Sequence, residues 1–249
     1  GAVYGIGGYF GTRFVNEDLF NTAAGQSNTN TTDAPIMKLN EVLLNYLEAA
    51  AELNDMGAYT LSQKDLDITI NEIRKRASVN MPAVTLSGKN FSVNGVIIND
   101  PDRDLGNSEV VGDYEVSPIL WEVRRERRIE LVYEGIRFDD IRRWGKLHYA
   151  DMKINKKLNL GAWLDKEAYL KESNQANGTS YTIDDLKDIL LDREGNSGYI
   201  KPIQVSSLLR TYGEKDYLYP IPTGQISLYN SKSEQLGDSS IKLEQNPGW

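Results

Sequence analysis

The sequence predicts a mainly α-helical chain whose helices are separated by long irregular loops. Three stretches, at about 35–54, 63–79 and 118–134, repeat apolar residues at steps of three and four, which is the period of one helix face. The stretch 1–34 is rich in Gly, Asn and Thr, and the stretch 80–116 is polar, so both are predicted to be irregular.

The first predicted helix covers about 35–54. Asp33 can cap its start and Pro35 is tolerated in a first turn, while a Gly-containing turn at 54–57 ends it. Its apolar stripe is predicted to face the core and consists of Ile36, Leu39, Leu43, Tyr46, Ala50 and Leu53.

The second predicted helix covers about 63–79 and starts with Ser62 and Asp65, which fit a capping box. Its stripe consists of Leu66, Ile70, Ile73 and Ala77. Together the two helices predict a hairpin, and the turn at 51–59 resembles that of a tetratricopeptide repeat. We find one such unit, whereas a solenoid needs about three repeats for stability.

Asn94-Gly95 predicts a tight hairpin turn within residues 92–97. The third helix is predicted over 118–134, with Ser117 as its cap and Gly135 as its end. A short helix follows, with Phe138, Ile141 and Trp144 at helical spacing and Gly145 at its end.

Residues 147–216 give mixed signals. Ile183, Leu186 and Leu190 predict one more helix, capped by Thr182 with Asp185. The last 33 residues are predicted to be extended, with a short helical turn at 223–228.

Composition excludes several function classes. The formal net charge of −8 repels phosphate backbones and argues against nucleic-acid binding. The chain has no cysteine and one histidine, His148, so thiolate and multi-histidine metal sites are excluded. We expect His148 to face solvent, and we find no apolar run of membrane-spanning length.

The third predicted helix carries the densest charge cluster. Glu126 and Glu130 lie four residues apart and could act as paired carboxylates in acid–base catalysis. Arg124, Arg127 and Arg128 alternate with them, and neighbouring guanidiniums hold a carboxyl pKa low, which is the wrong state for a general acid. We therefore interpret the cluster as a buried or half-buried ion network.

An Asp-rich loop at 100–109 partly fits a calcium-binding pattern. Asp100, Asp102 and Asp104 alternate, and Glu109 could contribute. Calcium loops need Gly at position 6 and Glu at position 12, whereas here Gly106 falls at position 7 and position 12 is Val111. We therefore favour a solvated loop and predict no metal site.

Aromatic residues in polar segments are the candidate ligand contacts. An aromatic ring can stack on the C–H face of a sugar while polar neighbours bond its hydroxyls. The candidates are Tyr4, Tyr9 and Phe10 near the N-terminus, and Trp163, Tyr169 and Tyr181. Ordinary partial burial is the alternative for each of them. Trp121 and Trp144 are expected in the core, and Trp249 is expected to pack back on the body.

Five motifs in fixed order resemble the C-terminal half of the SusD/RagB family. They are Glu41-Val-Leu-Leu-Asn-Tyr46, the segment 73–77, the Glu-Arg to Arg-Trp-Gly-Lys run at 126–146, Tyr217-Leu-Tyr-Pro-Ile-Pro222 and Gln245-Asn-Pro-Gly-Trp249. The resemblance covers most of 33–146 and 217–249. It implies that residues 1–249 form the C-terminal region of a longer protein, with the N-terminal half and lipid anchor outside this chain.

This resemblance implies an all-α fold with tetratricopeptide-like helical hairpins and long loops. It also implies a non-catalytic lipoprotein at the outward-facing surface of the outer membrane, which captures glycans or oligosaccharides. The partner would be a SusC-like TonB-dependent transporter, with no cofactor, and contact with the membrane only through the absent N-terminal lipid. Three alternatives stay open: a peptide-capturing relative, a tetratricopeptide interaction module, and a glycoside hydrolase that uses Glu126 and Glu130.

Overall fold

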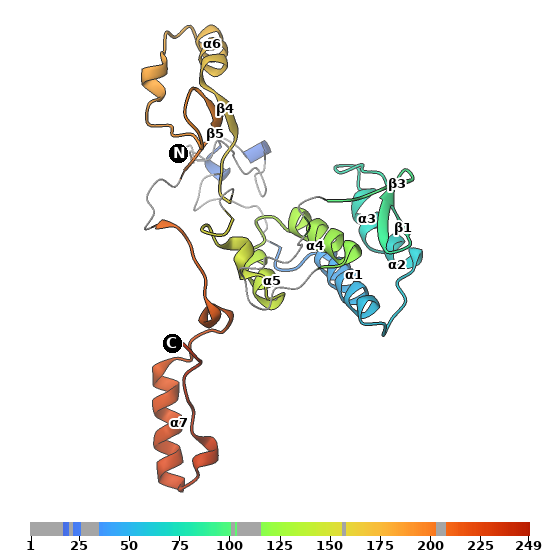
Figure 1. Cartoon of the computed structure of the whole chain (residues 1–249), viewed down its shortest axis with the longest axis vertical. Coiled ribbons are helices and arrows are strands. Elements are labelled where there is room, and N and C mark those ends of the chain that lie inside the picture. The colour runs from blue at the N-terminus through green and yellow to red at the C-terminus, as the bar shows by residue number, and fades with distance from the viewer. Residues whose placement is uncertain are drawn as a thin grey trace. The chain divides into compact units, whose positions relative to one another are not determined.

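The computed structural model describes residues 17–19, 22–25, 35–100, 103, 116–155, 158–202 and 208–249. These residues form mainly helices with a few short strands, which confirms the predicted fold class (Figure 1). The chain divides into two compact units, one formed by residues 13–140 and the other by the rest. None of the helices in the described part is long and apolar enough to span a membrane.

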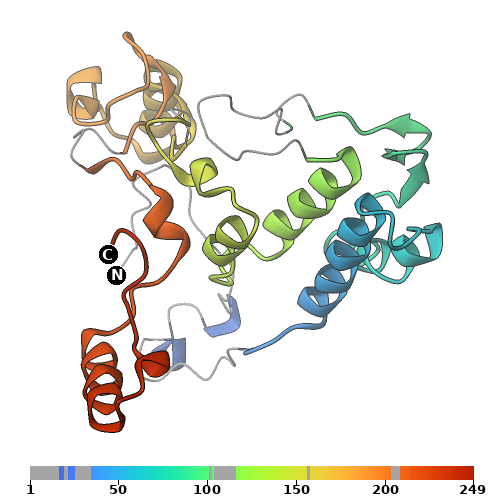
Figure 2. The same cartoon turned by 60° about the horizontal axis from the view of Figure 1, so that its bottom comes forward.

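In the first unit, α1 (Leu39–Asp55) packs against α4 (Pro118–Glu130), and the two helices lie side by side in Figure 1 and Figure 2. The helix was predicted from residue 35, but it begins at Leu39. Pro35 therefore lies outside it, and the predicted cap Asp33 lies outside the described residues.

The predicted core face of α1 is wrong in most of its residues. Leu39, Tyr46 and Leu53 are exposed, and Ile36 precedes the helix and is exposed as well. Ala50 is buried and Leu43 is partly buried, as predicted, but the rest of the core side is lined by Leu44, Leu47, Glu48 and Ala51. Apolar residues occur on both faces of this helix, so their spacing alone could not decide which face is buried.

The second predicted helix is interrupted. It forms α2 (Gln63–Asp67) and α3 (Ile70–Arg74), with Thr69 between them at φ −125° and ψ −96°. The Thr69 hydroxyl donates to the Asp65 carbonyl, a local bond that competes with a regular helix. The predicted capping box of Ser62 and Asp65 is confirmed, whereas the tetratricopeptide-like character of the hairpin stays a prediction.

A three-stranded antiparallel sheet follows, formed by β1 (Val84–Ser87), β2 (Asn90–Val93) and β3 (Val96–Ile97). Asn94 and Gly95 have φ of 51° and 78°, as a two-residue hairpin turn requires, so the predicted hairpin is confirmed. Phe91 and Val84 join the core of the unit.

The start of α4 is as predicted, because the Ser117 side chain accepts a hydrogen bond from Leu120 N. The helix ends at Glu130, four residues earlier than predicted, and Gly135 at φ 81° leads into α5 (Arg137–Arg143). Trp121 is partly buried against the core, and Val123 is fully buried.

In the second unit, Trp144 is buried as predicted, but the expectation for His148 is wrong. His148 lies in the short helix η3 (Leu147–Ala150), where it is buried and contacts the Tyr149 ring edge to face at 4.7 Å. The neighbouring residue Leu147 is apolar and fully buried, so this turn packs in the interior.

Residues 158–202 form a small mixed module. It contains β4 (Trp163–Asp165), α6 (Lys166–Asn177), the 3-10 helix η4 (Ile183–Leu186) and β5 (Ser197–Tyr199). Helix α6 was not predicted. Asp165 caps it by accepting hydrogen bonds from Glu167 N and Ala168 N, and Gly178 ends it at φ 65°. The helix predicted near Leu190 is only η4, although its Thr182–Asp185 capping box is present.

The C-terminal segment is more helical than predicted. It holds η6 (Glu214–Tyr217), α7 (Thr223–Leu236) and η7 (Ser239–Ile241), where a short turn at 223–228 was expected. Near the N-terminus, the described residues include two short 3-10 helices, η1 (Glu17–Leu19) and η2 (Ala23–Gly25). Trp249 was expected to pack on the body; it folds back onto its own C-terminal segment, where its Nε1 donates to the carbonyls of Lys215 (3.0 Å) and Leu218 (3.1 Å).

Candidate functional site

The candidate site is built on the small sheet of the 158–202 module. β4 and β5 pair antiparallel, so that Trp163 lies directly opposite Tyr199. The chain before β5 adds to the other side of the same strand, because Leu191 bridges to Ile200 and Asp192 N donates to Tyr199 O at 2.9 Å. Since residues opposite one another share a face, Trp163 and Tyr199 lie on one face of this sheet, and the Asp192 backbone lies beside Tyr199 on the neighbouring segment.

Gly198 makes the close packing of this sheet possible. A Cβ at Gly198 would come within 2.7 Å of Asp192 Oδ1 and 3.3 Å of Leu191 Cβ. The same Asp192 oxygen accepts a 2.8 Å hydrogen bond from Tyr199 N. The absent side chain at Gly198 therefore brings the Asp192 carboxylate next to Tyr199.

The two rings meet at a right angle. Their centroids are 5.1 Å apart and their planes are inclined by 85°, while Trp163 is 51% exposed and Tyr199 is 41% exposed. The Arg193 guanidinium lies 4.9 Å from the centre of the Trp163 ring. We call Trp163, Tyr199, Asp192 and Arg193 the aromatic face.

Arg193 is held in place by its neighbour. Its Nε and Nη2 donate to the two Asp192 oxygens at 3.1 Å each. The hydrogen bond with Arg193 lowers the pKa of Asp192, and the same pair raises the pKa of Arg193. Both groups therefore stay charged near neutral pH, and their charges offset each other.

This arrangement suits the binding of a ring that has apolar faces and polar edges. Exposed indole and phenol rings offer stacking surfaces, and the adjacent guanidinium and carboxylate offer hydrogen bonds in both directions. The rings stand on paired strands that are further fixed by α6, whose Lys166 is buried and donates through Nζ to Leu186 O at 2.9 Å.

Of the six predicted contact residues, only Trp163 is in the aromatic face. Tyr169 and Tyr181 are exposed on α6 and just after it, and no ring contact joins either of them to Trp163 among the described residues. Tyr4, Tyr9 and Phe10 lie outside the described residues.

Sequence reasoning missed Tyr199, Asp192 and Arg193. Tyr199 lies in a strand of three residues, and Asp192 and Arg193 follow a single β-bridge. Such short paired segments do not show the alternation of apolar and polar residues that predicts a strand. The turn residues Glu194, Gly195 and Asn196 between Arg193 and Ser197 were the available signal, because they are typical of a connection between two strands.

The charged cluster of α4 is a structural ion network, as interpreted from the sequence. Glu126 pairs with Arg74 at 2.8 Å and Glu130 pairs with Arg76 at 2.7 Å. Arg127, which is buried, pairs with Asp140 at 2.7 Å and with Glu48 at 3.7 Å. These pairs join α1, α3, α4 and α5 within residues 13–140.

Within the described part of the chain, no group of three or more His, Cys, Asp or Glu could hold a metal ion. Most of the Asp-rich loop, including Asp102, Asp104 and Glu109, lies outside that part. Asp100 is described and accepts a 3.0 Å hydrogen bond from Trp121 Nε1.

A sequence model of the SusD family matches residues 4–249. The chain belongs to the SusD family. Among solved structures, a SusD-like carbohydrate-binding protein from Bacteroides fragilis is 31% identical, with a TM-score of 0.42. The match covers 78% of this chain and 28% of that protein, so the chain spans less than a third of its length. No curated protein matches the chain significantly.

Proposed function

We propose that this SusD-family chain is a non-catalytic capture protein that binds glycans or oligosaccharides at the cell surface. It delivers them to a SusC-like TonB-dependent transporter in the outer membrane. The main support for this proposal is the aromatic face, where two half-exposed rings lie beside a guanidinium and a carboxylate that are bonded to each other. Rings of this kind stack on sugars, and the polar pair selects hydroxyl orientation.

A hydrolytic function is less well supported. Two catalytic carboxylates must face one ligand, and one of them must be protonated. Glu126 and Glu130 are instead each bonded to an arginine, at 2.8 Å and 2.7 Å. Arg74, the partner of Glu126, is itself buried, so this pair is a fixed part of the helical unit.

Binding is tested by calorimetry of the protein against a panel of soluble oligosaccharides. We expect Trp163→Ala to weaken binding of any hit at least about tenfold, the size expected for a central aromatic contact. Tyr229→Ala, which removes an equally exposed ring from α7, is the matched control and should leave the affinity unchanged. Equal affinity of Trp163→Ala and wild type would contradict the proposed site.

The absence of turnover is tested on the same samples by chromatography of the ligand after long incubation. Recovery of intact ligand is expected. If shorter products appear and disappear again in Glu126→Gln, the hydrolase alternative replaces the proposal. Co-purification of a TonB-dependent transporter from outer membranes that contain the protein tests the partner, and recovery of the protein without it would contradict delivery.

A further inference from the structure

The aromatic face carries a positive group without a net positive charge. Both oxygens of Asp192 are engaged by Arg193, at 3.1 Å each, so one carboxylate offsets one guanidinium. Arg193 Nη1 takes no part in this pairing and can donate to a ligand oxygen. The face therefore presents hydrogen-bond donors and acceptors that are charged individually and neutral together.

A second carboxylate lies on the same side of the sheet. Asp165 follows Trp163 by two residues in β4, so the two side chains share a face at a spacing of about 7 Å. Asp165 caps α6 through its Oδ1, which fixes it there. A ligand stacked on Trp163 would therefore lie within range of an additional negative charge.

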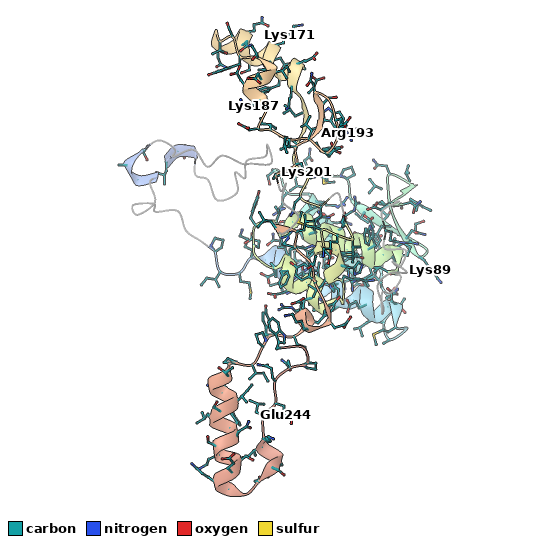
Figure 3. The ribbon with its side chains drawn as sticks, turned by 60° about the vertical axis from the view of Figure 1, so that its left-hand side comes forward. Lys89, Lys171, Lys187, Arg193, Lys201 and Glu244 are labelled. Carbon is teal, nitrogen blue, oxygen red and sulfur yellow. The ribbon has the colours of Figure 1, made fainter. Side chains whose placement is uncertain are left out.

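The basic residues of the 158–202 module do not gather near the face. Residues 158–202 contain eight Asp and Glu against five Lys and Arg. Lys166 is buried and bound to the Leu186 carbonyl. Figure 3 shows Lys171, Lys187 and Lys201 at separate places along the module, with Lys201 below Arg193 in this view. The module thus has no cluster of basic side chains at the aromatic face that could offset the negative charge of an anionic glycan.

An anionic sugar would meet unfavourable electrostatics at this face. A carboxylate or sulfate group placed beside Arg193 would compete with Asp192 for the guanidinium and would approach Asp165. Hydroxyl groups avoid both costs, because they can donate to Asp192 and accept from Arg193. Like charges at close range discriminate between otherwise similar ligands.

We propose that the aromatic face takes uncharged pyranose units and rejects glycans that carry carboxylate or sulfate groups. This inference rests on the proposed glycan-capture function and names the substrate class of the same site. Asp192 sets the preference for uncharged over anionic glycans, because its carboxylate offsets the positive charge of Arg193. Asp192 is thus a specificity-determining residue.

The test compares oligosaccharides that differ only in charge, such as galacturonan hexamers with free carboxylates and with methyl-esterified carboxylates. Neutral and sulfated oligosaccharides are measured beside them by calorimetry, at low and at high NaCl. We expect neutral members alone to bind, with an affinity that NaCl leaves unchanged and that Trp163→Ala weakens at least about tenfold. An anionic glycan that binds through Trp163 and weakens with NaCl would overturn the inference while leaving glycan capture intact. Binding to no glycan would overturn both.

Asp192→Asn tests the assigned residue directly. The amide oxygen can still accept from Tyr199 N, while the charge that balances Arg193 is lost. We expect the ratio of affinities for anionic and neutral ligands to rise about tenfold, as one added charge interaction allows. Asp188→Asn makes the same charge change at an exposed position of the module and should leave the ratio unchanged. An equal ratio in all three proteins would overturn the role of Asp192, and the salt series decides the inference if Asp192→Asn fails to fold.

Discussion

Asp65 shows how much one side chain can organise in this fold. Its carboxylate accepts hydrogen bonds from Ser62 N (2.8 Å), the Ser62 hydroxyl (2.6 Å) and the phenols of Tyr46 (2.8 Å) and Tyr59 (2.9 Å). Asp65 therefore ties the turn after α1 to the start of α2. The sequence predicted the capping box, but the two tyrosines come from outside that motif and only the folded chain brings them to Asp65.

We predict that Asp65→Ala lowers the free energy of unfolding by about 2 kcal/mol, because it removes a cap and leaves several donors unpaired. Urea unfolding followed by circular dichroism measures the change. Lys64→Ala, an exposed neighbour in the same helix, serves as the control and should stay within about 0.5 kcal/mol of wild type. An equal effect of both substitutions would show that the Asp65 bonds contribute nothing.

The same residue predicts a pH dependence. Desolvation raises the pKa of Asp65, but the hydrogen bonds from Ser62, Tyr46 and Tyr59 outweigh it and lower the pKa from 3.8 to about 2. Because the folded pKa is the lower one, the stabilisation is complete above about pH 4 and is lost as the pH falls towards 2. The difference in urea midpoint between wild type and Asp65→Asn should shrink over this range, and a constant difference would contradict the assignment.

At the scale of elements, α1 is apolar on two sides. Leu44, Leu47 and Ala51 are buried, while Leu39, Val42, Tyr46, Leu53 and Met56 are exposed. Spacing at steps of three and four fits both sets, so the sequence predicted the helix but not its orientation. The buried side of α1 is the one that carries Glu48, which pairs with Arg124 and Arg127 of α4. The sequence around Glu48 does not reveal these partners, so a charged residue was not expected on the core side.

We predict that Leu47→Ala costs about 2–5 kcal/mol, because it opens a cavity in a packed core. Leu53→Ala removes the same atoms from the exposed side of the same helix and should cost no more than about 1 kcal/mol. Thermal and urea unfolding of the two variants measure the difference. A larger loss for Leu53→Ala than for Leu47→Ala would reverse the observed orientation of α1.

The sheet of the 158–202 module depends on a single glycine. We predict that Gly198→Ala separates Asp192 from Tyr199, because the new Cβ would come within 2.7 Å of the Asp192 carboxylate. Hydrogen exchange should become faster at Asp192 N and Lys201 N, which both bond across this strand pair. Gly224→Ala adds the same methyl group to α7, where nothing lies within 4 Å, and should leave this exchange unchanged.

At the scale of the whole molecule, a substitution that destabilises one unit should leave the stability of the other unit unchanged. Glu126→Ala leaves the buried Arg74 guanidinium without its 2.8 Å partner, which typically costs about 3–5 kcal/mol. We expect faster hydrogen exchange throughout α1, α3 and α4 and unchanged exchange in residues 158–202, since the two lie in different units. Uniform acceleration across the chain would show that the units unfold together.

Sequence reasoning reached the family and the helical class but little of the candidate site. Motifs such as Tyr217-Leu-Tyr-Pro-Ile-Pro222 are contiguous and can be recognised without a structure. The aromatic face is assembled from β4, β5 and residues 192–193, which come together only through strand pairing. Trp163 was predicted because it is an aromatic residue in a polar segment. Only the pairing register of β4 and β5 shows that Tyr199, and not Tyr169 or Tyr181, lies opposite Trp163.

His148 gives the protein a natural spectroscopic probe. As the chain has a single histidine, the imidazole resonances can be assigned to His148 without a series of histidine variants. The Tyr149 ring, 4.7 Å away and nearly edge to face, will shift these resonances from their free-peptide positions. Their return to those positions on heating or in urea would report the melting of this buried turn, separately from the helices that dominate the circular dichroism.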